Sequence, residues 1–121
     1  MIINFILVGF GAIFGAIFRY GLTLLIKNPH FPFSMLIINA LGSFAIGLVS
    51  ILFRENIQVY TFLAVGIFGG FTSFSTFSLD TIIMFENGKI LLGFLNIFLS
   101  IFVCLILCFL GRKLGIRIFK Y

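Results

Sequence analysis

The chain alternates between four long apolar segments and three short polar connections, and it ends in a basic tail, "GRKLGIRIFKY". A membrane-spanning helix needs about 20 mostly apolar residues, and each apolar segment is long enough to supply one. The predicted spanning helices cover about residues 2–26, 34–53, 58–84 and 90–110. The connections "KNPHFPF", "REN" and "FENGK" hold both prolines. The pattern predicts an all-α integral membrane protein with one four-helix transmembrane domain over residues 1–121.

The third segment is interrupted at its middle by Gly69 and Gly70, which are followed by a cluster of hydroxyl side chains. As one straight helix the segment would be roughly 40 Å long, against a hydrocarbon core of about 30 Å. Tilting or close helix packing at the glycines would explain the pattern, and so would a break. Carbonyl groups freed by a break are tolerated in a membrane only where they face protein, water or an ion. Because hydroxyls follow at once, we predict a functional break at Gly69-Gly70.

Small or polar side chains recur every four residues along each of the other three segments. These stripes are Gly11-Gly15-Arg19, Asn39-Ser43-Gly47 and Asn96-Ser100-Cys104-Cys108. Uncharged polar stripes can simply hold helices together in a membrane. Three such stripes beside a broken helix favour a conduit instead.

Two polar residues lie well inside the predicted spans. Arg19 is the only cation at such depth, where a charge is expensive and usually faces a bundle interior or an aqueous cavity. Its long side chain could also reach the membrane surface near Lys27, so both interpretations stay open. Asn39 has no route to either surface, and its amide therefore needs hydrogen-bond partners inside the membrane.

Composition and charge narrow the class of protein. Hydrophobic residues make up 62% of the chain and charged residues 9%, with a mean hydropathy of +1.31, which excludes a soluble domain of this size. The net charge of +5 comes from cations at segment ends, which suits membrane flanks and gives no reason to expect nucleic acid as a partner. The sequence pattern contains no nucleophile–base pair and no cluster of metal ligands, so we do not expect an enzyme.

Three motifs resemble those of one known family. "GGFTSFSTFS" (69–78), "GAIFRY" (15–20) and "NALGSF" (39–44) are similar, in the same order, to the signatures of the Fluc/CrcB family of fluoride channels. The resemblance implies passive, selective export of fluoride across the plasma (inner) membrane of a bacterium, which relieves fluoride toxicity. It also implies a dual-topology dimer, in which two four-helix subunits insert in opposite orientations.

The resemblance assigns roles to individual residues. The backbone carbonyls of Gly69 and Thr72 would hold a structural sodium ion at the dimer axis. The residues implied along the fluoride path are Phe74, Phe77, Asn39, Ser43, Thr76 and Ser100, with Arg19 near an entrance and Asn96 where the family has a tyrosine. Neutral hydroxyls and amides can replace the water around fluoride without trapping it, and aromatic ring edges are positive enough to favour an anion.

Alternatives remain for both function and assembly. A small proton-coupled multidrug exporter also has four spans, but it needs an embedded acid, and here only Asp80 could serve. A non-selective pore or scaffold protein would pass chloride as readily as fluoride. More cations flank the side that holds both termini, which predicts termini in the cytoplasm. This bias, and the missing tyrosine, favour an antiparallel dimer with a homologous second subunit over an antiparallel homodimer.

Overall fold

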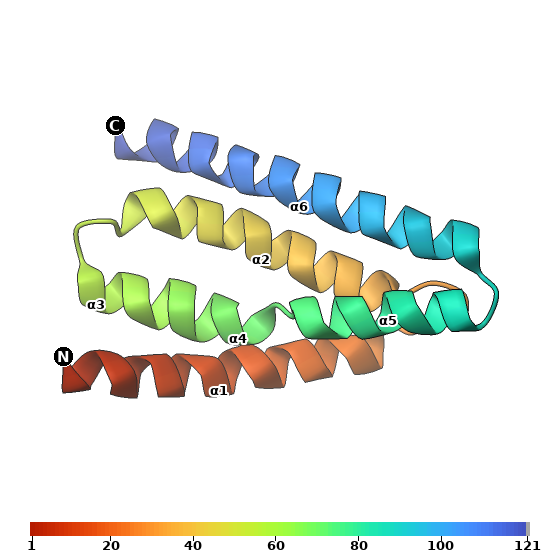
Figure 1. Cartoon of the computed structure of the whole chain (residues 1–121). Helices are drawn as coiled ribbons and strands as arrows, with labels where there is room; N and C mark the ends of the chain where they lie inside the picture. The colour runs from red at the N-terminus through yellow and green to blue at the C-terminus, as the bar shows by residue number, and fades with distance from the viewer. Residues whose placement is uncertain (121) are drawn as a thin grey trace.

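The computed structural model describes residues 1–120, and this part of the chain is a bundle of antiparallel helices without strands (Figure 1). Tyr121, the last residue of the predicted domain, lies outside the described residues. The helical stretches long and apolar enough to cross a membrane are Ile2–Leu25, Phe33–Leu52, Ile57–Glu86 and Ile90–Phe119. The protein is therefore a multi-pass membrane protein, as its hydropathy predicts. Both chain ends lie at the same end of the bundle (Figure 1).

Three of the four stretches are continuous helices: α1 (Ile2–Leu25), α2 (Phe33–Leu52) and α6 (Ile90–Phe119). Helix α6 continues past Leu110, where the predicted span ends, and takes in most of the basic tail. This extension packs on α2 at Gly111 and Gly115, where a Cβ atom would collide with Phe44 and Ile51. Helix α6 is therefore longer than a membrane span requires, and part of the additional length packs against α2.

The third stretch consists of α3 (Ile57–Tyr60), the π-helical segment η1 (Thr61–Phe68), α4 (Gly69–Phe71) and α5 (Phe74–Glu86). Its interruption lies at Thr72 and Ser73, whose backbones are extended, with φ/ψ of −85°/157° and −151°/109°. Gly69 and Gly70 are helical, so the predicted position of the break is wrong. The physical reason is packing, because a Cβ on Gly70 would lie 2.8 Å from the carbonyl oxygen of Ala12. Gly70 serves close contact with α1, and α4 ends at the next residue, Phe71.

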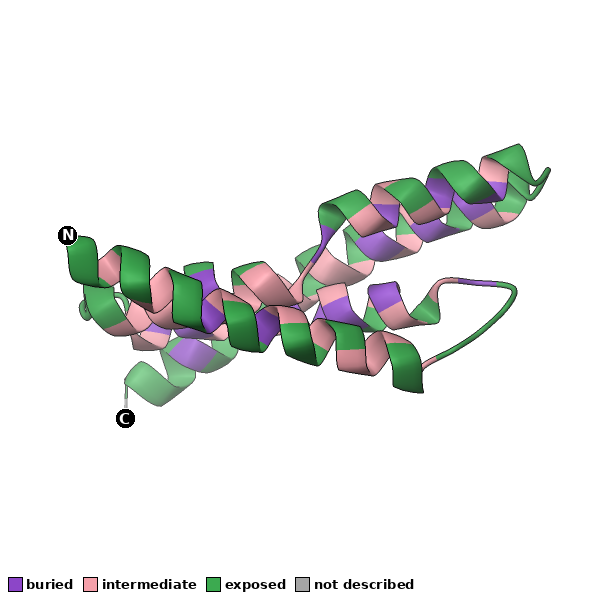
Figure 2. Ribbon diagram, turned by 90° about the horizontal axis from the view of Figure 1, so that it is seen from below, coloured by how far each residue is buried: buried purple, intermediate pink, exposed green. Residues whose placement is uncertain are grey.

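Glycines bring the helices together in pairs. Helix α1 packs against η1 and α4 at Gly11 and Gly15, and a Cβ on Gly15 would overlap the carbonyl oxygen of Ile67. Such small-residue contacts let helix backbones approach closely in a membrane, where apolar burial gives little drive for association. Buried residues accordingly follow the inner helix faces, and the outer faces are exposed (Figure 2). A small core of Met35, Ile38 and Phe77 lies where α2 meets α5.

Candidate functional site

The interruption between α4 and α5 is held by a side chain from another helix. Asn39, on α2, accepts a hydrogen bond from the backbone N–H of Ser73 through Oδ1 at 2.8 Å. Its Nδ2 group donates to the carbonyl oxygen of Ser73 at 3.2 Å. One amide thus satisfies both backbone groups of a residue that has left the helical pattern, which would otherwise be costly inside a membrane. The buried amide of Asn39 has the partners that its depth requires.

The start of α5 is capped within the hydroxyl cluster. The Ser73 hydroxyl accepts a hydrogen bond from the backbone N–H of Thr76 at 3.1 Å and donates to Thr76 Oγ1 at 2.9 Å. This is the usual N-cap arrangement, in which a side-chain oxygen satisfies a backbone donor of the first turn. Ser73 is buried, and Thr76 is held by the cap. Part of the hydroxyl cluster therefore serves the local fold.

The end of α4 leaves backbone acceptors free. The backbone N–H and the hydroxyl of Thr72 both donate to the Phe68 carbonyl, at 3.1 and 2.9 Å. The next four carbonyl oxygens accept no hydrogen bond from any group in residues 1–120; they belong to Gly69, Gly70, Phe71 and Thr72. Free carbonyls at a helix C-terminus carry partial negative charge and are suitable ligands for a small hard cation. These acceptors include both predicted sodium ligands.

A groove of about 360 Å³ lies beside the interruption, between α2, the third stretch and α6. Its lining combines apolar walls with a few polar groups, as ligand sites usually do. The predicted site residues that it brings together are Asn39, Ser43, Thr72, Phe74, Phe77 and Ser100. None of the residues that line it carries a charge. An ion in this groove would meet no formally charged side chain of the lining.

Phe74 and Phe77, two of the three aromatic residues that line the groove, differ in their surroundings. The rings of Phe74 and Phe77 lie 5.4 Å apart, centroid to centroid, and are tilted by 51°. Phe77 is 9% exposed and packs in the core with Met35 and Ile38, whereas Phe74 is 77% exposed. One ring is thus fixed by the fold of this chain, and the other stands at its surface.

Four predicted site residues lie outside the groove lining. Arg19 is half-buried on α1 and makes no hydrogen bond or ion pair within residues 1–120. Asn96 is 2% exposed and is hydrogen-bonded between α5 and α6. Thr76 belongs to the cap of α5, and Gly69 is exposed at the end of α4.

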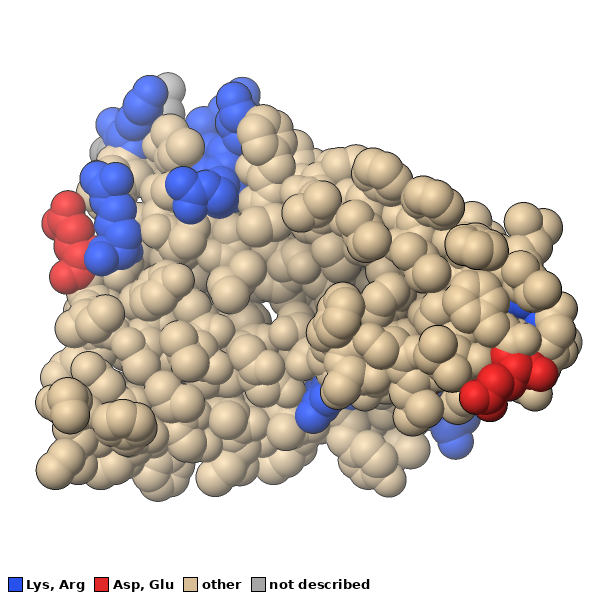
Figure 3. Space-filling model, viewed as in Figure 1, with Lys and Arg blue, Asp and Glu red and all other residues tan. Residues whose placement is uncertain are grey.

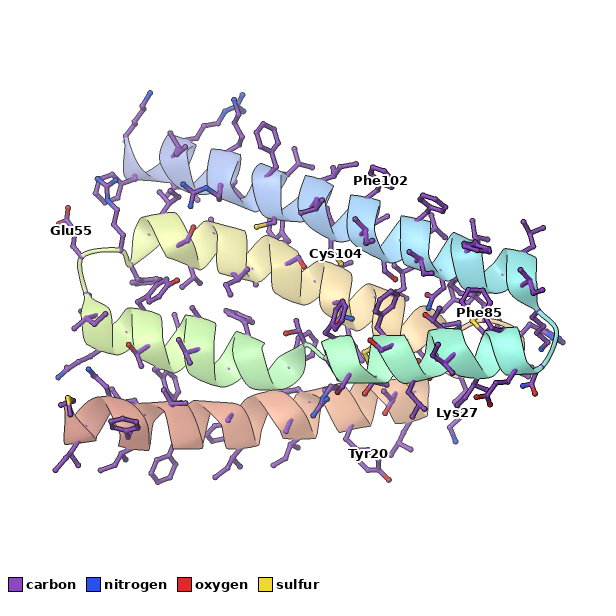
Figure 4. All side chains as sticks on the ribbon, viewed as in Figure 1. Tyr20, Lys27, Glu55, Phe85, Phe102 and Cys104 are labelled. Atoms are coloured by element: carbon purple, nitrogen blue, oxygen red, sulfur yellow. The ribbon has the colours of Figure 1, made fainter. Side chains whose placement is uncertain are left out.

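Sequence reasoning missed several residues that shape the groove. Gly42 lies where a Cβ would collide with the side chain of Thr72, so its position in "NALGSF" allows α2 to approach the interruption. Cys104 lines the groove and lies between α6 and α2 (Figure 4). The remaining unpredicted lining residues are Ile46, Phe68, Ile101 and Leu105. The polar stripe of the fourth segment includes Cys104 one helical turn after Ser100, but the sequence alone did not assign it to the ion path.

A second, more polar cavity of about 280 Å³ lies at the opposite end from the termini. The connections α1–α2 and α5–α6 form it, and its lining includes His30, Asp80 and Lys89. Asp80 therefore lies beside charged and polar connection residues and not beside the groove.

The chain matches the family model described as "CrcB-like protein, Camphor Resistance (CrcB)" over residues 6–112. The fluoride-specific ion channel FluC of Ruminiclostridium cellulolyticum is 45% identical over 119 residues, which cover 93% of this chain and 92% of that protein. The protein of the same name from a strain of Thermus thermophilus is 42% identical over 118 residues, with 93% and 94% covered. That from Agrobacterium fabrum is 38% identical over 124 residues, with 97% and 99% covered.

Proposed function

This chain belongs to the CrcB family, and on that premise we propose that it is a fluoride-specific ion channel. The observation that carries the proposal is the uncharged groove beside the interrupted helix, which brings together Asn39, Phe77 and Ser100 from three segments of the chain. Fluoride leaves the cell passively along this groove, across the plasma membrane of a bacterium, and its toxicity is thereby relieved.

The groove offers fluoride a substitute for its hydration shell. The hydroxyls of Ser43 and Ser100 can donate to the anion, and so can the second N–H of the Asn39 amide. Ring edges of Phe74 and Phe77 add weak positive potential. Conduction requires binding that is strong enough for entry and weak enough for release, and neutral donors meet this requirement better than a fixed cation would.

The free carbonyls at the end of α4 support a structural sodium ion. Those of Gly69 and Thr72 would hold it, because they are oxygen acceptors without a donor in residues 1–120. A bound cation supplies positive charge that compensates the negative end of α4. Within the described residues, no group of three or more His, Cys, Asp or Glu side chains could hold a metal ion instead.

The working channel is an antiparallel dimer. Phe74 is 77% exposed beside the groove and Gly69 is exposed at the free carbonyls, so both places have room for a second subunit. Cations gather at the end of the bundle that holds the C-terminus (Figure 3), and they include Arg54, whose guanidinium lies 5.0 Å from the Phe119 ring centroid. This asymmetry favours one orientation for each chain. A homologous, oppositely oriented partner would then complete the dimer, and a second copy is the alternative.

Anion flux from liposomes tests the proposal. The purified chain is reconstituted in liposomes loaded with fluoride or chloride, and efflux is followed with ion-selective electrodes after potassium permeability is introduced. Fluoride efflux without chloride efflux is expected. Equal flux of both ions would indicate a non-selective pore, and flux that requires a proton gradient would indicate a coupled exporter. If the chain alone gives no fluoride efflux, it is coexpressed with a homologous gene. Efflux from the coexpressed proteins would indicate a missing partner, and no efflux would indicate that the proposed function is wrong.

A further inference from the structure

A chain of buried hydrogen bonds joins α5 to the groove, and it includes Thr81, which does not line the groove. The Thr81 hydroxyl donates to the carbonyl oxygen of Phe77 at 2.8 Å, and Asn96 Nδ2 donates to Thr81 Oγ1 at 2.9 Å. The Ser100 hydroxyl then donates to Asn96 Oδ1 over 3.4 Å. Thr81, Asn96 and Ser100 are all buried. Of these three, Ser100 alone reaches the groove.

Thr81, at the α5 end of this series of hydrogen bonds, fixes which groups in it donate and which accept. The Thr81 hydroxyl has one proton, and because it is donated to Phe77, a lone pair of Thr81 faces Asn96. The Asn96 amide must therefore turn its nitrogen toward Thr81 and its oxygen toward Ser100. Ser100 consequently donates its proton to Asn96 and presents lone pairs elsewhere. A fluoride ion in the groove would need the proton.

We propose that Thr81 is a positioning residue that lets this hydrogen-bond chain reverse when fluoride reaches Ser100, an inference that rests on the proposed function. In the reversed order, Thr81 donates to Asn96 Oδ1 and the rotated amide donates to Ser100 Oγ. Ser100 then donates to fluoride. Each side-chain donor keeps one acceptor, and the Phe77 carbonyl retains the backbone N–H that donates to it in an α-helix.

Two features make reversal feasible. The bond from Ser100 to Asn96 is 3.4 Å long, well beyond the roughly 2.7–2.8 Å typical of a hydroxyl donor, so Ser100 loses little on turning. An amide carries donors and an acceptor on groups of similar size, so rotation about one torsion exchanges them. Asn96 does not line the groove and therefore acts through Ser100. Asn96 therefore controls whether Ser100 can donate its proton to the ion, and does not contact the ion itself.

Two substitutions at Thr81 test the effect of its hydroxyl on fluoride flux separately from the effect of its shape. Thr81→Val removes the hydroxyl with little change in volume and should lower fluoride flux roughly five-fold, the equivalent of one neutral hydrogen bond. Thr81→Ser keeps the hydroxyl and should stay within about two-fold of the wild type. Ser78→Ala is the matched control, because the Ser78 hydroxyl also donates to the carbonyl four residues earlier on α5 but has no link to Ser100.

A double-mutant cycle distinguishes positioning from general support of the fold. If Thr81 acts through Ser100, Thr81→Val should cause no further loss of flux in a Ser100→Ala background. The same loss in both backgrounds, or wild-type flux in Thr81→Val alone, would overturn the inference. Size-exclusion chromatography checks that each variant is folded, and Asn96→Leu replaces Thr81→Val if the latter does not fold. Absence of fluoride flux from the wild type, alone and with a homologous partner, would instead overturn the proposed function.

Discussion

Replacement of Asn39 by leucine removes the side chain that holds the interruption of the third stretch. Leucine keeps the approximate shape of asparagine but cannot accept from the Ser73 N–H or donate to the Ser73 carbonyl, which Asn39 does at 2.8 and 3.2 Å. A net hydrogen bond contributes about 0.5–1.5 kcal/mol, and each buried backbone group left without a partner costs about 1–3 kcal/mol. Two such groups are left, so Asn39→Leu should lower the free energy of unfolding by roughly 2–6 kcal/mol. It should also abolish fluoride flux.

The chain supplies its own control for this substitution. Asn4 lies within α1, and its side-chain oxygen is buried without a hydrogen-bond partner in residues 1–120. Asn4→Leu removes an unsatisfied polar group and should change the free energy of unfolding by less than about 0.5 kcal/mol or increase it. Steric trapping in bicelles measures both variants under the same conditions. Equal unfolding free energies for Asn39→Leu and Asn4→Leu would refute the assigned role of Asn39.

Further predictions concern helix packing and the groove. Gly15→Ala should destabilise the protein by about 1–3 kcal/mol, because the added methyl meets backbone atoms of η1. Gly21→Ala, with no neighbour within 4 Å, should be tolerated; similar thermal melts for both would contradict this. Phe74→Ile and Phe77→Ile should sharply cut fluoride flux without loss of folded protein, and normal flux in both would exclude a role for ring edges. In a variant whose only thiol is Cys104, methyl methanethiosulfonate should reduce flux; complete labelling with unchanged flux would place the ion elsewhere.

The four spanning stretches could be predicted because lipid requires long apolar runs, whatever the tertiary contacts are. The position of the interruption could not be predicted from local preference. Gly69-Gly70 is the weakest helix-forming pair of the third stretch, yet contact with Ala12 keeps Gly70 helical. The actual interruption depends on Asn39, which lies 34 residues from Ser73 in sequence. A partner so distant in sequence cannot be predicted from the local sequence pattern.

The groove was predictable to the extent that its residues belong to recognisable motifs or share a stripe. Asn39, Phe77 and Ser100 were found in this way, and all three line it. Thr81 was not found, because a threonine whose hydroxyl bonds the preceding helical turn is common in membrane helices. Its link to Asn96 arises from the α5–α6 turn, where Gly88, at φ of 77°, reverses the chain and brings the two helices together.

The interruption does more than expose carbonyls, because it places two helix ends of opposite polarity side by side. The C-terminal end of α4 carries free carbonyl oxygens, and at the N-terminal end of α5 the backbone N–H groups of Phe74 and Ser75 donate to no group in residues 1–120. Each end is equivalent to about half an elementary charge, negative at α4 and positive at α5. Phe74 lines the groove, so the positive end of α5 lies next to the fluoride path that we propose. A single break can thus favour a cation on one side and an anion on the other, without a charged side chain that would hold the anion too tightly.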